Sequence, residues 1–252
     1  MQDTRWSNRM KSIVVFKWLM HPQDARVGAD GSVDWRGVKL SASDDDPAAI
    51  LTARDIAADG DEIIGLTIGD GDLAWAAARG AARTVVVTDA LSDADSAAIG
   101  AVLAAGVKHI GGDVVLIGDS VWDYGVVVSM AAHLGWSTLA NVLTAEKQGA
   151  GFRVTQKLGS ETRVVGVAGP VVLATAASRA EQQVPGMKEV LAARKKPVEK
   201  ITKADLGISG TGAATSLETK FPDTSPAKII DGAEPAAAVE ALMAALRMEG
   251  VL

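Results

Sequence analysis

Three short polar segments are the parts of this sequence best suited to hold a ligand. They are Ser43-Asp44-Asp45-Asp46, Ile68-Gly69-Asp70 and Gly118-Asp119-Ser120, the last of which leads on to Gly125. Each is expected to lie at the carboxyl end of a β-strand. In a parallel sheet, helix N-termini and free backbone amides gather at that edge and bind phosphate groups. The spacing therefore predicts a nucleotide-binding site there.

The sequence offers no set of residues that would catalyse bond-making on its own. It has no cysteine, and its histidines, His21, His109 and His133, show no metal-ligand spacing. No Ser/His/acid set or catalytic carboxylate pair is apparent. The run Asp44-Asp45-Asp46 has oxygen ligands for a hard cation, but three consecutive residues do not easily face one ion. We predict no catalytic residue and no metal site.

Composition narrows the class of protein further. The 252 residues are 48% hydrophobic and 22% charged, which is ordinary for a globular protein with a real core. The net charge of -6 argues against a nucleic-acid partner, because binding nucleic acid requires a basic face. No apolar run reaches the roughly 20 residues of a membrane-spanning helix. We expect a cytoplasmic protein that is not integral to a membrane.

The first half of the chain alternates between β-branched and helix-like segments. The predicted strands cover residues 13–19, 62–68, 84–88 and 113–117, and the predicted helices cover residues 46–60, 73–79, 92–107 and 126–134. Asp46 is expected to cap the first helix, with Pro47 at its first position. Such alternation predicts an α/β fold, with a parallel sheet covered by helices on both faces.

The pattern changes after about residue 138. We predict a small β-hairpin from residues 152–158 and 162–167, a buried strand at 171–174, and no sheet pattern from Ser178 onward. The basic run Arg194-Lys195-Lys196 is either a docking patch for an acidic partner or a solvated charge run. A final amphipathic helix is predicted at 234–248.

These segments suggest three parts. Residues 1–9 form a polar extension, residues 10–200 form the α/β domain, and residues 201–252 form a long C-terminal arm. Because the last helix follows a Gly/Ser/Thr-rich linker, its apolar stripe needs a surface to pack against. That surface belongs either to its own domain or to another chain.

Several sequence tracts occur in the order found in one known family. The opening "IVVFKW" with Lys17, the later "GPVVLAT", and above all "KEVLAARKKPVEKITKADLGI" resemble tracts of the electron transfer flavoprotein beta subunits. The resemblance implies a flavodoxin-like sheet of the adenine-nucleotide-binding type. It also implies a heterodimer whose alpha subunit holds most of the FAD. The beta subunit would bury an AMP, or a second FAD in bifurcating members, and its arm would reach round the partner.

The resemblance also implies an AMP-like pocket. By position, its residues would be Val15, Ser43, Asp44, Asp45, Asp46, Ile68, Gly118, Ser120, Trp122, Asp123, Tyr124 and Gly125. Two segments depart from the family pattern: Ser43-Asp44-Asp45 replaces Asn-Pro-Phe, and the loop with Trp122 and Tyr124 lacks Gln-Thr-Gly. Carboxylates near a phosphate lower its affinity. The pocket therefore binds AMP, is filled by these two rings as core, or stacks them on an adenine or flavin.

The family also presents a recognition loop to flavin dehydrogenases, which donate electrons that pass on to a quinone-linked acceptor. Met187 stands at the apolar anchor position, next to Lys188. Alternatively, Met187 packs on its own helix. Two other functions stay open. The chain could be a nucleotide-binding stress or regulatory module working as a homodimer, or a structural subunit with a closed pocket.

Overall fold

The structure, a computed structural model, describes residues 9–91, 94–120, 124–176, 184–209, 218–222 and 227–252. The chain divides into two compact units. The first consists of residues 1–26 and 34–217, and the second of residues 27–33 and 218–252.

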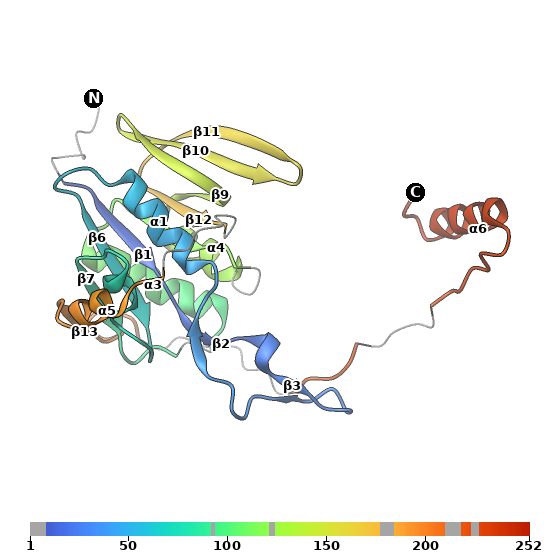
Figure 1. Cartoon of the computed structure of the whole chain (residues 1–252), viewed down its shortest axis with the longest axis horizontal. Coiled ribbons are helices and arrows are strands. Elements are labelled where there is room, and N and C mark those ends of the chain that lie inside the picture. Colours follow the sequence, from blue (N-terminus) through green and yellow to red (C-terminus); the bar gives the residue numbers. More distant parts are fainter. Residues whose placement is uncertain (1–8, 92–93, 121–123, 177–183, 210–217, 223–226) are drawn as a thin grey trace. The chain divides into compact units, whose positions relative to one another are not determined.

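The first unit is built on a nine-stranded mixed sheet (Figure 1). In spatial order its strands are β11 (Glu161–Ala168), β10 (Gly151–Leu158), β9 (Ser137–Gln148), β12 (Val171–Thr175), β8 (Val114–Gly118), β1 (Lys11–Val15), β6 (Glu62–Ile68), β7 (Arg83–Val87) and β13 (Val198–Ile201). Neighbours from β9 to β13 pair in parallel, whereas β9, β10 and β11 pair antiparallel. The predicted α/β fold is confirmed.

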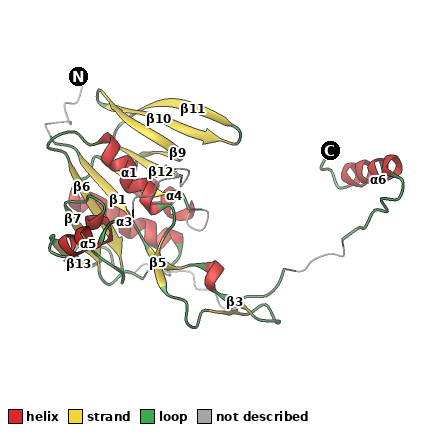
Figure 2. Ribbon diagram, in the orientation of Figure 1, coloured by secondary structure: helices red, strands yellow, loops and turns green. Residues whose placement is uncertain are grey.

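Helices cover both faces of this sheet (Figure 2). They are α1 (Asp46–Ile56), α2 (Trp75–Ala78), α3 (Ser96–Ile110) and α4 (Tyr124–Leu134). A further helix, α5 (Met187–Ala193), comes after β12 in the sequence. Side chains alternate across a strand, so Ile13 and Val15 pack in the core with α3 and α4, and Val14 and Phe16 pack with α1 and α2. Burial on both faces explains the continuous apolar run of β1.

The first predicted strand, residues 13–19, is divided in two. After β1 the chain leaves the sheet, and β2 (Trp18–Met20) pairs instead with β5 (Leu40–Ala42). The short elements η1 (Pro22–Asp24), β3 (Arg26–Val27) and β4 (Val33–Asp34) lie between them in sequence. The break occurs at Lys17, whose backbone N–H donates to a side chain of α1 rather than to a neighbouring strand.

Two expectations about the sheet were wrong or incomplete. Residues after Ser178 do contribute a strand, because β13 pairs with β7 along its whole length. The predicted hairpin is confirmed, because β10 and β11 pair antiparallel. It continues the main sheet through β9, which was not predicted.

Lys196 fastens the segment between α5 and β13 to the rest of the unit. Its Nζ donates to the carbonyl oxygens of Ala77, at 2.9 Å, and Ala81, at 2.7 Å. The N–H of Thr84 donates to the carbonyl oxygen of Pro197 at 3.1 Å. Lys196 is thus neither a docking group nor a solvated charge, because its ammonium group binds backbone carbonyls at and just after the end of α2.

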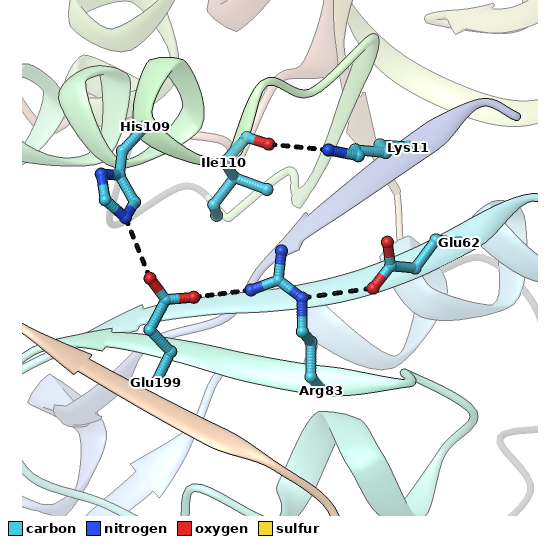
Figure 3. Close-up of polar contacts among 6 residues, drawn as sticks. All are labelled: Lys11, Glu62, Arg83, His109, Ile110 and Glu199. Atoms are coloured by element: carbon cyan, nitrogen blue, oxygen red, sulfur yellow. Dashed lines mark hydrogen bonds and ion pairs between the residues drawn. The ribbon is translucent and has the colours of Figure 1, made fainter.

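A polar network attaches β13 to its neighbours at the amino ends of the strands (Figure 3). Arg83 bridges Glu62, at 3.2 Å, and Glu199 of β13, at 2.7 Å. His109, near the end of α3, lies 2.9 Å from the other oxygen of Glu199. The hydrogen bond from His109, followed by the charge of Arg83, lowers the pKa of Glu199. This network holds the sheet together at the edge opposite the strands' carboxyl ends.

The lowered pKa of Glu199 predicts a pH-dependent contribution to stability. A carboxylate with a depressed folded-state pKa stabilises above its unfolded pKa, about 4.3, and loses this contribution as the pH falls through the folded value. Glu199→Gln should therefore lower the free energy of unfolding by about 0.5 kcal/mol at pH 7 for so exposed a pair. Urea denaturation should show this difference shrinking below about pH 4.

The matched control for this prediction is Glu161→Gln, at an exposed glutamate of β11. Its free energy of unfolding should stay close to that of the wild type across the same pH range. A Glu199→Gln difference that does not change with pH would contradict the electrostatic role of the network.

The second unit contains α6 (Pro235–Met248), which confirms the predicted C-terminal helix. Taken by itself, α6 buries none of its residues, although Val239, Leu242, Met243 and Leu246 follow one another at amphipathic spacing. In the same unit Gly31 has a φ of +81°, and a Cβ there would collide with the backbone of residues 220–221. Among the described residues, no helix is long and apolar enough to cross a membrane.

Candidate functional site

The strand order has its switch point between the carboxyl ends of β1 and β8. From β1 the chain proceeds to β6 and β7 on one side, then returns to β8 on the other side. The direction of the strand order reverses at this point. In open α/β sheets ligands bind at such a switch point, beyond the strand carboxyl ends.

The N-terminus of α1 lies directly against Gly118 at the end of β8. A Cβ at Gly118 would stand 2.8 Å from the carbonyl carbon of Asp45 and 2.9 Å from the nitrogen of Asp46. Such distances are too short for real contacts, so only glycine allows this approach. Ser43 shapes the turn, because its Oγ accepts from the N–H of Asp45 at 3.4 Å. The structure thus brings two of the predicted segments together.

Asp46 does not cap α1 as predicted. Asp45 occupies the N-cap position without a side-chain cap hydrogen bond, and Asp46 is the first helical residue. One Asp46 carboxylate oxygen instead accepts from the backbone N–H of Lys17 at 3.1 Å. Both residues are buried, and Asp44 is exposed. Asp46 therefore joins α1 to the end of β1.

Asp119 follows β8 directly and is the most unusual polar group at this edge of the sheet. Its backbone N–H donates to the carbonyl oxygen of Thr175 at 2.9 Å, and its Oδ2 accepts from the N–H of Asn141. The side chain is 9% exposed, and burial raises its pKa, because the charged form loses hydration. Its Oδ1 is buried and receives no hydrogen bond within the described part of the chain.

An irregularity in β9 holds the partner of Asp119 in place. Asn141 has a φ of +53°, a left-handed conformation that asparagine tolerates better than most residues. The register of β9 shifts between Leu139 and Val142 against β12, and between Val142 and Thr144 against β10. The Nε2 of Gln156 donates to the carbonyl oxygen of Ala140 at 2.7 Å. The peptide group between Ala140 and Asn141 is thus held from both sides, by Gln156 and Asp119.

The other predicted pocket residues lie in different surroundings. Val15 and Ile68 are fully buried in the core. Ser120 is buried beside Asp119. Tyr124 and Gly125 begin α4 instead of forming a loop, and Tyr124 is 48% exposed.

The idea that Tyr124 fills an emptied pocket as core is therefore wrong. Gly125 packs closely against Ser96 of α3. Trp122 and Asp123 lie outside the described residues.

The predicted docking residues begin α5. Met187 is 76% exposed and Lys188 is exposed, so Met187 does not pack on its own helix. Beside them is a groove of about 510 Å³ between α1, the end of α2 and the loop that precedes α5. Arg54 and Arg79 line it. The guanidinium of Arg79 lies 4.2 Å above the ring of Trp75, and burial lowers the pKa of Arg79.

Asn141 and Gln156 were missed at the sequence level, and Asp119 appeared only as part of a strand-end segment. An asparagine within an otherwise strand-like run is a weak signal of left-handed backbone. Nothing in the sequence indicates that Asp119 and Gln156 hold one peptide group, because that depends on strand pairing.

One comparison with known proteins bears on these residues. A family model described as "Electron transfer flavoprotein domain" matches residues 32–206. The match spans the chain from before α1 to beyond β13. It includes Gly118, Asp119, Asn141 and the start of α5, and it leaves β1 outside.

Proposed function

Because the chain belongs to the electron transfer flavoprotein family, we propose that it is the beta subunit of a heterodimer that carries electrons. The family match over residues 32–206 is the observation that carries this proposal. Electrons would come from flavin dehydrogenases and leave to a quinone-linked acceptor. We place this heterodimer in the cytoplasm.

The flavin of this heterodimer would be an FAD held mainly by the alpha subunit. Bound flavin supplies one- and two-electron transfer. This chain would cover one flank of the FAD and exclude water from it. In this proposal the chain catalyses no reaction with its own side chains.

The switch point between β1 and β8 would hold a second, AMP-like ligand, or a second FAD. The amides at the N-terminus of α1 suit a phosphate group. The carboxylates of Asp45 and Asp119 disfavour a phosphate group there, because like charges repel strongly at low dielectric. The residues present therefore fit the nucleoside part of such a ligand better than its phosphate.

Docking of the electron donor would use Met187 and Lys188. The exposure of Met187 supports an anchor that enters a partner's apolar pocket. Arg54 and Arg79 in the neighbouring groove would complement acidic groups around that pocket.

Copurification with an alpha-type partner tests the proposal. Expressed alone, the chain should be colourless, because its partner holds most of the FAD. Coexpressed with the partner, it should give a yellow heterodimer whose visible spectrum shows bound flavin. Nucleotides released by denaturation are then identified by chromatography.

The outcomes separate the alternatives. A stable chain that ignores alpha-type partners would contradict the proposed heterodimer and favour a regulatory module. A yellow heterodimer that releases FAD but no second nucleotide would indicate a structural subunit with a closed pocket.

A further inference from the structure

The groove between α1, the end of α2 and the loop before α5 has the size and composition of a small-molecule site. Its volume of about 510 Å³ falls within the roughly 300–1,000 Å³ of ligand pockets. Such pockets combine apolar walls with a few polar groups that converge on the ligand. Here the polar groups are Arg54, Arg79 and Glu189, and the apolar wall includes Pro47, Leu51, Val184 and Pro185.

The two arginines reach the groove from neighbouring helices. Pro47, Leu51 and Arg54 are spaced at i, i+4 and i+7 on α1, so they share one face of that helix. The stem of Arg54 passes along the backbone of Gly80, where a Cβ would lie 3.4 Å from its Cδ. Because Gly80 directly follows Arg79, the two arginines line the same part of the groove.

Within the described part of the chain, neither arginine forms an ion pair with a carboxylate. The guanidinium of Arg79 lies 4.2 Å above the ring of Trp75, and its Nη1 donates to the carbonyl oxygen of Trp75 at 3.1 Å. Burial lowers the pKa of Arg79, although the charges of Asp72 and Asp46 act the other way, and neither of those residues lines the groove. A bound anion would compensate for the hydration that Arg79 has lost.

The charge of the groove suggests which anion it binds. Among the described residues that line it, Glu189 is the only acidic one, and its Oε2 already accepts from the N–H of Gly186 at 2.6 Å. Two arginines and one glutamate leave an excess of one positive charge, which suits a monoanion. A guanidinium matches the planar geometry of a carboxylate, and the apolar wall suits an apolar group attached to it.

We propose that this groove binds a small organic carboxylate. Its carboxylate group would lie on Arg54 and Arg79, and its apolar part would lie against Pro47, Leu51 and Val184. The site is separate from the strand ends and does not depend on electron transfer. Because the same arginines are proposed above to face a partner's acidic groups, the ligand and that partner would compete. This competition alone rests on the proposed function.

Titration of the ¹⁵N-labelled full-length chain, followed by NMR, tests the site. The probes are hexanoate, its uncharged analogue hexanamide, and acetate. Hexanoate should bind about tenfold more tightly than hexanamide, because only hexanoate carries the charge that the arginines recognise. It should also bind about tenfold more tightly than acetate, because its additional methylene groups contact the apolar wall. The amide signals of Leu51, Arg54 and Gly80 should shift, and those of β11 should not.

Variants of the two arginines connect the binding to the groove. Arg54→Gln and Arg79→Gln should each weaken hexanoate binding at least about fivefold and reduce the preference over hexanamide. Arg54 is exposed, so Arg54→Gln should fold as the wild type does, even if Arg79→Gln disturbs the contact with Trp75. The matched control is Arg153→Gln, at an exposed arginine of β10 outside the groove, which should keep the wild-type affinity.

Three results would overturn the proposal. The first is equal binding of hexanoate and hexanamide by the wild type, which would leave the arginines to an acidic partner. The second is wild-type hexanoate affinity in Arg54→Gln. The third is a set of shifted amide signals that lies away from the groove. A yellow heterodimer in the separate copurification would leave the proposed electron-carrier function standing in each case.

Discussion

Removing residues 227–252 is expected to weaken assembly of the proposed heterodimer by about 100-fold or more. The deletion takes away α6, whose apolar side chains, Val239, Leu242, Met243 and Leu246, are not buried in the second unit. Burying such side chains on a partner contributes about 1 kcal/mol each when they are already half-covered, and ordering the helix offsets part of that gain. Affinity is measured by titrating labelled chain with the alpha-type partner.

Point variants on α6 test whether the loss of affinity comes from its apolar stripe or only from removing the helix. Leu242→Glu places a charge on the apolar stripe and should weaken assembly at least about tenfold. Ala241→Glu places the same charge on the opposite side of the helix, where it should have little effect. Equal effects of the two variants would contradict an interface through the stripe. Full affinity in the truncated chain would contradict the arm's role altogether.

Replacing Gly118 by valine is expected to destabilise the chain by about 2–3 kcal/mol, the range of overpacked buried sites. A side chain at Gly118 meets the backbone of Asp45 and Asp46, not the flexible end of a side chain, so α1 must move away from β8. That movement would also disturb the hydrogen bond between Asp46 and Lys17. Urea denaturation followed by circular dichroism measures the loss.

Gly166 is the matched control for this prediction. It also lies in a strand, β11, but a Cβ there would meet nothing within 4 Å. Gly166→Val should therefore change stability by less than about 0.5 kcal/mol. If both variants were equally stable, the close approach of α1 to β8 would be refuted.

The central fold was predictable because local and global signals agree. The strands β1, β6, β7 and β8 are continuous β-branched runs, as expected for strands buried on both faces. Helical segments with recognisable stops lie between them. β13 carried no such signal, because Val198–Ile201 is short and has two adjacent charged residues, Glu199 and Lys200, between its apolar ends. Glu199 of β13 instead pairs with Arg83 of β7 and with His109 of α3, both distant in sequence.

The candidate site was predictable only to the level of strand ends. Gly118 lies at the end of β8 as expected and meets Asp45 and Asp46, but Ser43 follows β5, which pairs antiparallel with β2 outside the parallel sheet. The roles of individual carboxylates were not predictable. Asp46 had the local pattern of a helix cap, but its hydrogen bond to Lys17 replaces that role. The hydrogen bond of the Asp119 carboxylate depends on the left-handed backbone of Asn141, which the sequence does not reveal.

The attachment of β13 also has a consequence for the order of folding during synthesis. Arg83 and Glu199 are 116 positions apart, so β7 remains an open edge until most of the chain has left the ribosome. Closing so long a loop carries an entropy cost that must be met before the new contacts contribute. A nascent chain with an unpaired, apolar edge strand is prone to associate with other chains. The nascent chain is therefore expected to be most prone to association before β13 pairs with β7.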